Sequence, residues 1–181
     1  MDKSKMKCKK VINIFAGPGV GKTTIASELF LNLKIKGIDA ELALEYAKEL
    51  VFDKRMDILK CDQLYIFAKQ NRRLLRLMGD AEFVITDAPL PLTMYYFNQE
   101  TNIYDEDIFK KLVMDTFNKY PNYNILLKRN MNFKYQEVGR YQTEEQAVQM
   151  DYEIEKFLKS CSINYIEHLA GTPINMEKII N

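Results

Sequence analysis

Short apolar runs alternate along the chain with longer segments in which apolar residues recur every three or four positions. The runs fall at residues 11–15, 38–44, 82–87, 123–128 and 162–167 and are typical of strands. The periodic segments fall at 24–36, 62–78, 105–119 and 143–158, with shorter helices near 47–55 and 92–97. Strands that alternate with helices form parallel sheets through right-handed crossovers. The pattern predicts an α/β fold, a five-stranded parallel sheet with helices on both faces.

Several helix ends are marked by residues that cap helices. Asp62 and Asp105 precede periodic segments, and Thr143 opens a T-E-E-Q capping box. Thr172 with Pro173 predicts the start of a short last helix. Each of the first three of these helices is expected to turn one stripe toward the core. The stripes are Leu64, Phe67, Ala68, Asn71, Leu75 and Met78 on the helix at 62–78; Ile108, Phe109, Leu112 and Phe117 on the helix at 105–119; and Ala147, Met150, Ile154, Phe157 and Leu158 on the helix at 143–158.

The first apolar run leads into AGPGVGKT at residues 16–23, which has the spacing of a phosphate-binding P-loop except for Ala16 at the first glycine position. Glycines let backbone N–H groups converge on a triphosphate, Lys22 can reach the β- and γ-phosphates, and the Thr23 hydroxyl can ligate Mg²⁺. A glycine-rich turn that happens to precede Lys-Thr is the alternative, but strand, loop and helix follow in the required order. The expected nucleotide-binding residues are Gly17, Pro18, Gly19, Val20, Gly21, Lys22, Thr23 and Thr24.

Two carboxylates follow strands. Glu45 comes after the second run, and Asp87 ends the third, directly before Ala-Pro-Leu-Pro. Ligands of open parallel sheets bind at the carboxyl ends of the strands, so both are candidates for the active edge. An apolar strand that ends in Asp is typical of a Walker B segment.

Other polar residues are candidates for substrate contacts. Gln63, Gln70 and Arg73 fall on one face of the long helix, although this face could simply be solvated. Residues 129–142 lack periodicity and hold Arg129, Lys134 and Arg140, which predicts either a cationic lid over the phosphates or an ordinary basic surface loop. We expect Gly171, in the last strand-to-helix turn, to contact the nucleotide base, and His168 to be structural or at the surface.

Length and charge narrow the class of protein. The 181 residues suit one domain, which we place at 11–181 after a flexible basic tail at 1–10. A net charge of +1 gives no sign of an obligate polyanion binder, although a local basic groove remains open. Three cysteines without CxxC spacing and one histidine predict no metal cluster and favour a reducing cytoplasm. The sequence has no run of about 20 apolar residues, so no membrane association is expected.

The segments GPGVGKTT, LEYAKEL, DQLYIFAKQNRR, VITDAP and KR…GRYQTEEQA resemble, in this order, a small kinase-type P-loop family related to ribosylnicotinamide kinases, especially short bacteriophage members. The resemblance covers nearly the whole chain, and some phage relatives phosphorylate hydroxymethyluracil within DNA. One departure is TDAP, where ribosylnicotinamide kinase relatives more often have an Asp-Arg pair. The acceptor pocket is therefore expected to differ from theirs.

The resemblance implies phosphoryl transfer from ATP with Mg²⁺. It assigns the metal to Thr23 and Asp87 and makes Glu45 the preferred general base, although Asp87 could exchange roles with it. Arg129 and Arg140 would close from the lid. The three polar residues of the long helix would read the acceptor.

The acceptor is expected to be a nucleoside- or nucleotide-like molecule, or modified DNA bound by a groove of Arg72, Arg73, Arg76, Lys128, Lys134 and Arg140. A motor or switch ATPase and a non-catalytic binding module remain alternatives. The predicted location is the cytoplasm, that of the host if the chain is phage-encoded, and the oligomeric state, monomer or homodimer, stays open.

Overall fold

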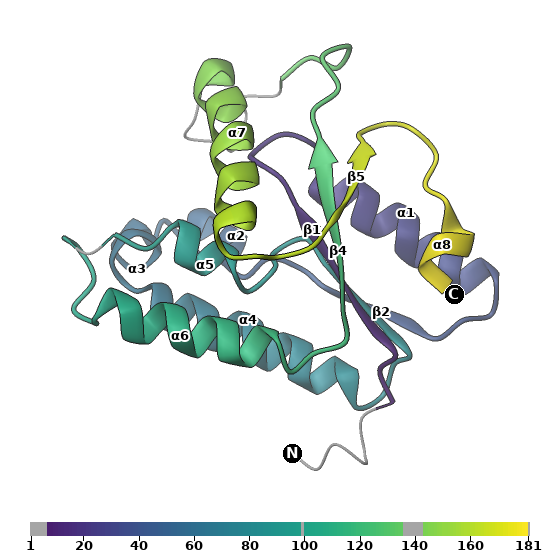
Figure 1. Ribbon diagram of the computed structural model, residues 1–181, viewed down its shortest axis with the longest axis horizontal. Coiled ribbons are helices and arrows are strands. Elements are labelled where there is room, and N and C mark those ends of the chain that lie inside the picture. Colours follow the sequence, from purple (N-terminus) through teal and green to yellow (C-terminus); the bar gives the residue numbers. More distant parts are fainter. Residues whose placement is uncertain (1–6, 99, 136–142, 181) are drawn as a thin grey trace.

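A five-stranded parallel sheet forms the centre of the computed structural model, which describes residues 7–98, 100–135 and 143–180 (Figure 1). The strands are β1 (Lys10–Phe15), β2 (Ala40–Ala43), β3 (Phe83–Thr86), β4 (Asn122–Lys128) and β5 (Ile166–Leu169). Their order in the sheet is β2-β3-β1-β4-β5, and every pairing is parallel. The predicted fold class is thus confirmed.

Helices cover both faces of this sheet. They are α1 (Lys22–Ile35), α2 (Ala47–Phe52), α3 (Met56–Cys61), α4 (Gln63–Met78), α5 (Leu92–Tyr95), α6 (Glu106–Phe117), α7 (Glu144–Ser160) and α8 (Met176–Ile180). One buried cluster lies between the sheet and α4, α6 and α7, and the other lies between the sheet and α1 and α8. The strands contribute alternate residues to the two clusters, for example Val11 to the first and Ile12 to the second. None of the helices in the described ranges is long and apolar enough to cross a lipid bilayer.

Three of the predicted caps are confirmed. The Asp62 side chain accepts from the backbone N–H of Tyr65, and Asp105 accepts from that of Ile108. Thr143 forms the complete capping box with Gln146. These caps satisfy N–H groups that would otherwise lack an intrahelical partner, and so they fix where α4, α6 and α7 begin.

The end of the chain was predicted incorrectly. Strand β5 begins at Ile166, because the chain first turns at Ser162, whose φ is +54°, and then buries Ile163 in the cluster beneath α7. Helix α8 begins at Met176, and Asn175 rather than Thr172 accepts hydrogen bonds from its first backbone N–H groups. The Thr172 hydroxyl instead donates to the carbonyl of Leu169.

Two other expectations about element bounds need correction. The helix predicted near 47–55 ends at Phe52 as α2, because Lys54 adopts a left-handed conformation with a φ of +56°, and a further helix that was not predicted, α3, follows at Met56–Cys61. The basic segment before β1 is partly ordered: backbone N–H groups of Cys8 and Lys9 donate to the carbonyls of Met78 and Glu82. Residues 8–10 are therefore bonded to the domain rather than part of a free tail, and residues 1–6 lie outside the described ranges.

The inward face of α4 differs from the predicted stripe. The buried residues follow helical spacing but include two glutamines: Gln63, Ile66, Phe67, Gln70, Leu74 and Met78. On α6, the buried residues are Phe109, Val113 and Phe117, whereas Ile108 and Leu112 are exposed. The expected face of α7 is largely confirmed, since Ala147, Ile154 and Leu158 are buried.

Candidate functional site

The loop between β1 and α1 has the backbone conformation that an anion site requires. Gly19 and Gly21 have φ values of 82° and 106°, in the left-handed region where glycine is favoured. Gly21 is the N-cap of α1, and no side chain caps this helix. The first backbone N–H groups of α1, together with the positive end of its dipole, therefore suit the phosphates of a nucleotide.

Lys22 lies back across this loop. Its Nζ donates to the carbonyls of Ala16 (3.0 Å) and Gly17 (3.1 Å). The ammonium group is thus held close to the glycine-rich turn. A phosphate bound there would lie within reach of the same group.

Asp87 joins the P-loop to the segment that follows β2. Its Oδ2 accepts from the Thr23 hydroxyl (2.6 Å), and its Oδ1 accepts from the backbone N–H of Glu45 (2.9 Å). Asp87 is buried, and it directly follows β3, the strand between β2 and the central β1.

Mg²⁺ takes six oxygen ligands in an octahedron, and several of these are usually water or phosphate oxygens. The oxygens of Thr23 and Asp87 would suit two of the remaining positions. In the described part of the chain, no group of three or more His, Cys, Asp or Glu side chains is placed to hold a metal ion.

Glu45 is the second carboxylate of the site. Burial raises the pKa of its carboxyl group, the nearby Lys22 charge lowers it, and the Asp87 charge raises it again. Tyr96, which follows α5, has its own phenol pKa raised by burial and by the Glu45 charge. The strand before Glu45, β2, does not neighbour the P-loop strand β1, because β3 lies between them. Glu45 joins the site through the segment after β2, which crosses the end of β3 and bonds to Asp87.

The glutamines of α4 bond to the chain itself. The buried Gln70 amide accepts from the backbone N–H of Tyr46 and donates to the carbonyl of Ala43 and the hydroxyl of Thr86. Gln63 donates to the carbonyl of Leu59, and its side chain is buried. The alternative of a solvated face therefore does not hold for these two amides: Gln70 is bonded at the ends of β2 and β3, and Gln63 is bonded to α3. Their contact with an acceptor stays a prediction.

Arg73 lies at the border of the same site. It donates to the carbonyl of Leu44 (2.9 Å) and pairs with Glu49 (2.5 Å), and its guanidinium lies 5.1 Å from the ring centre of Tyr46. Arg73 thus stabilises the segment that carries Glu45. Acceptor recognition by Arg73 stays a prediction.

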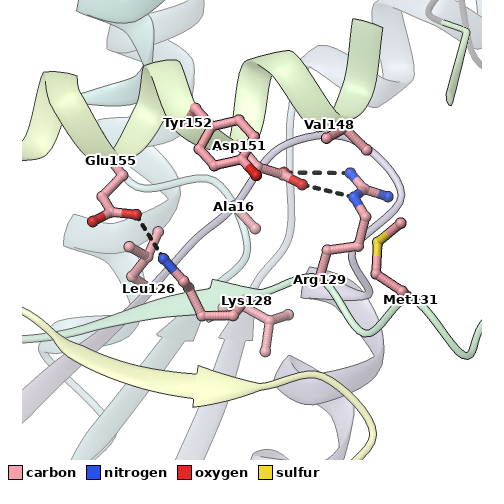
Figure 2. Close-up of a pocket in the computed structure, with 10 residues that line it drawn as sticks. Ala16, Leu126, Lys128, Arg129, Met131, Val148, Asp151, Tyr152 and Glu155 are labelled. Atoms are coloured by element: carbon pink, nitrogen blue, oxygen red, sulfur yellow. Dashed lines mark hydrogen bonds and ion pairs between the residues drawn. The ribbon is translucent and has the colours of Figure 1, made fainter. Parts of the chain in front are cut away.

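The start of the expected lid is already ion-paired. Arg129 pairs with Asp151 of α7, and Lys128 pairs with Glu155 one turn further along that helix (Figure 2). A cavity of about 200 Å³ lies between these pairs, lined also by Ala16 of the P-loop. The exposed Lys134 follows in the described part, whereas Arg140 and the rest of the predicted lid lie outside the described residues.

The turn after β5 packs against the segment that follows β4. Gly171 has a φ of +77°, and a Cβ there would lie 2.3 Å from the ring of Phe133. Asn130 donates to the carbonyl of Ala170 in the same turn. His168 is partly exposed in β5, and its Nε2 lies 3.1 Å from the carbonyl oxygen of Thr172. Contact of Gly171 with a nucleotide base stays a prediction.

Sequence reasoning missed Asp151 and Thr86. Asp151 falls on the inward side of α7 with Ala147, Ile154 and Leu158, so an acidic residue within an apolar stripe was the available signal. Thr86 is fully buried at the end of β3, where its hydroxyl donates to the carbonyl of Ala43. Because threonine is common in strands, a threonine at position 86 gave no sign of a role in the site.

The central parallel sheet, the glycine-rich turn and the Asp87 carboxylate define the P-loop NTPase fold in its nucleoside-kinase-like form. Residues 11–173 match the family model described as an AAA domain, and the chain belongs to this AAA_28 family of P-loop proteins. No curated protein matches the chain significantly.

The solved proteins with similar folds include two kinds of nucleotide-binding protein. The first is a NadR protein in complex with NAD and AMP-PNP, with 16% identity and a TM-score of 0.57; the match covers 88% of this chain and 44% of that one. The second is deoxyadenosine kinase from M. mycoides, with 18% identity, a TM-score of 0.52 and 94% coverage of both chains. This chain thus spans less than half the length of the NadR chain that it matches. At these identities the similarity supports the fold.

Proposed function

We propose that the chain is an ATP-dependent kinase that transfers the γ-phosphoryl group to a hydroxyl of a nucleoside- or nucleotide-like acceptor. The observation that carries this proposal is the pairing of two carboxylates with different surroundings. Asp87 is bonded to Thr23 of the P-loop, whereas Glu45 is bonded to Asp87 only through its backbone. One carboxylate is thus available for the metal and the other for a proton.

The residues have separate roles in the transfer. Lys22 and the P-loop N–H groups hold the β- and γ-phosphates and neutralise charge as it spreads in the transition state. Mg²⁺, held by Thr23 and Asp87, neutralises further phosphate charge when it is bound. Glu45 accepts the proton of the acceptor hydroxyl while the new O–P bond forms and the bond to the ADP oxygen breaks. The raised pKa of Glu45 makes it a stronger base than an exposed glutamate.

Both lid arginines belong to the same proposal. Arg129 would stabilise phosphate charge from beside the P-loop, and Arg140 would do so from the segment outside the described residues. Gly171 would contact the nucleotide base.

The test is phosphoryl transfer from γ-labelled ATP to a panel of nucleosides, ribosylnicotinamide, nucleotides and hydroxymethyluracil-containing DNA. We expect label in one class of acceptor, with ADP formed in equal amount. ADP release that does not depend on any acceptor would instead identify a non-kinase P-loop ATPase. Absence of both reactions, with nucleotide binding retained, would contradict the kinase proposal.

The second candidate acceptor is modified DNA, and the outer side of α4 favours it. Lys69, Arg72 and Arg76 are exposed there, and none of them forms an ion pair with another described residue. Lys69 lies over the rings of Tyr46 and Tyr65, which are bonded to each other through their hydroxyls (3.1 Å). Cations beside aromatic rings suit a nucleic-acid strand. Lys128, by contrast, is neutralised by Glu155, which weakens the expected groove on the lid side.

A further inference from the structure

Three parts of the fold meet at the carboxylate of Asp151 in α7. Its Oδ1 accepts from the backbone N–H of Gly17 (3.1 Å) and from Nη2 of Arg129 (3.3 Å), and its Oδ2 accepts from Nε of Arg129 (2.6 Å). The same Nη2 of Arg129 donates to the carbonyl of Pro18 (2.8 Å). Asp151 therefore links α7, the end of β4 and the first half of the P-loop, as Figure 2 shows for the pair with Arg129.

The pair between Asp151 and Arg129 is poorly exposed to solvent. The side chain of Arg129 is 10% exposed and that of Asp151 is 22% exposed. Removal of one partner from a pair of this kind leaves a charge with little water around it, which is costly. Because the carboxylate also accepts from two nitrogens of the same guanidinium, the orientation of Arg129 is fixed as well.

Gly17 shows how closely α7 approaches the loop. A Cβ at this position would lie 2.3 Å from Oδ1 of Asp151, closer than real contacts allow, and 3.2 Å from the carbonyl oxygen of Ala147, which is an unusually tight contact. Gly17 is not among the glycines with a left-handed φ, so glycine is needed here for the close approach of α7. Its N–H, which we expected to bind phosphate, is bonded to Asp151 instead. The phosphates are thus left to the N–H groups nearer the start of α1.

We propose that Asp151 is a positioning residue for the nucleotide site. By fixing the N–H of Gly17 directly and the carbonyl of Pro18 through Arg129, it holds the first half of the P-loop in the shape that directs the following N–H groups at the phosphates. This proposal rests on nucleotide binding by the P-loop, the first step of the proposed function. It does not depend on the identity of the acceptor or on the transfer itself.

Glu155 provides a matched control. It lies one helical turn further along α7 and is also an ion-paired carboxylate, but its partners are Lys128 (2.6 Å) and Lys159 (2.6 Å), outside the P-loop. Loss of either acidic residue removes one negative charge from the same helix. The general electrostatic effect on phosphate binding therefore has the same direction in both variants.

The experiment compares Asp151→Ala, Asp151→Asn and Glu155→Ala in the full chain by titration with Mg²⁺ and a non-hydrolysable ATP analogue, well below each melting temperature. Loss of a hydrogen bond to a charged group predicts a Kd about tenfold higher for Asp151→Ala. The Asp151→Asn amide oxygen can still accept from Gly17, so its loss of affinity should be smaller. Glu155→Ala should stay within about twofold of the unaltered chain. An unchanged Kd for Asp151→Ala, or an equal loss in Glu155→Ala, would overturn the proposal.

Hydrogen exchange of the Gly17 amide, followed by NMR without nucleotide, gives a second readout. We expect exchange to be at least about tenfold faster in Asp151→Ala and unchanged in Glu155→Ala. Equal exchange rates would contradict the proposal even if the chain bound no nucleotide, an outcome that would overturn the proposed function separately. If Asp151→Ala does not fold, Asp151→Asn against Glu155→Gln repeats both comparisons, with a smaller expected difference in the same direction.

Discussion

The side chains of the site differ in how firmly hydrogen bonds within the chain hold them in place. Asp87 is buried and accepts from two different segments, so its position is fixed before any ligand binds. Lys22 is held by backbone carbonyls that a phosphate would replace. This difference predicts that substitutions at the two positions affect different measured quantities.

Lys22→Ala should lower the rate of phosphoryl transfer on the order of 10²–10³-fold, because the ammonium group neutralises charge that develops on the transferred phosphoryl group. The melting temperature should change little, since Lys22 donates to carbonyls of the loop itself, which water can hydrate when the side chain is removed. The control is Lys36→Ala, which removes an exposed lysine at the far end of α1. Turnover within tenfold of the unaltered chain would contradict the role of Lys22.

The two carboxylates should be separable by metal titration. Asp87→Asn should raise the Mg²⁺ concentration needed for half-maximal rate, whereas Glu45→Gln should lower kcat on the order of 10²-fold or more with little change in that concentration. Rates measured across a Mg²⁺ series for both variants decide the assignment. If Glu45→Gln is the variant with altered metal dependence, the roles are exchanged.

The raised pKa of Glu45 predicts how stability depends on pH. Below the pKa of glutamate in the unfolded chain, Glu45 is protonated in both states and Glu45→Gln should have little effect on the free energy of unfolding. As the pH rises through the higher pKa of the folded state, ionisation within the buried site opposes folding. Glu45→Gln should therefore stabilise the chain increasingly toward neutral pH. Thermal melts between pH 4 and pH 8 test this, and a stabilisation that is constant with pH would refute it.

Among the elements, α4 has the clearest structural link to the site. Gln70 reaches across from this helix to Tyr46, Ala43 and Thr86, and so joins the ends of β2 and β3 to the segment that bears Glu45. Arg73, almost one turn further along, holds the same segment from the outside. Through these bonds to the residues on either side of Glu45, α4 positions this candidate general base.

Gln70→Met keeps the volume of this side chain but removes all three hydrogen bonds. It leaves buried polar groups without partners and should destabilise the chain by about 2–4 kcal/mol. It should also lower kcat, because Glu45 loses its support. Denaturant unfolding and kinetics measure the two effects. A raised KM for the acceptor at unchanged stability would instead return Gln70 to acceptor recognition.

The elements themselves could be predicted from the sequence because apolar spacing and capping residues are local signals. The capping box at Thr143 and the caps at Asp62 and Asp105 show this. The inward face of α4 could not, because Gln63 and Gln70 are polar by type, and the partners of Gln70 at Ala43 and Thr86 are supplied only by the tertiary fold. Within the site, the glycine-rich motif predicts Lys22 and Thr23 directly, because they belong to its spacing. The apolar stripe of α7 marks Asp151 as an unusual acidic residue, but its partner Gly17 lies 134 positions away in the chain, and no local pattern encodes that contact.

For the molecule as a whole, the distribution of charge bears on the acceptor. Of the exposed cations of α4 that form no ion pair with a described residue, Lys69 lies over the ring of Tyr46, which follows Glu45, whereas Lys128 and Arg129 are paired with carboxylates of α7. A polymeric acceptor would therefore be expected along α4.

Salt dependence separates the two kinds of acceptor. Phosphate contacts release counterions, so the affinity for DNA should fall with a log–log slope of about −0.7 to −0.9 per phosphate contacted, while KM for a nucleoside should be nearly independent of salt. Arg72→Ala with Arg76→Ala should make the DNA slope shallower by about two phosphates, with Lys110→Ala on α6 as a control. A flat profile without labelled DNA would exclude the polymeric acceptor.

The central position of β1 also has a consequence for how the chain is made. This strand is the first to be synthesised, yet both of its neighbours come much later: Lys10 aligns with Phe83 of β3, and Val11 aligns with Asn122 of β4. Its apolar residues stay without their sheet partners until β3 and β4 have left the ribosome. During that time the nascent chain exposes an apolar strand without partners, so we expect chaperones that bind hydrophobic segments to improve its yield. A message truncated before the codons for β4 would consequently yield an aggregating product rather than a smaller working domain.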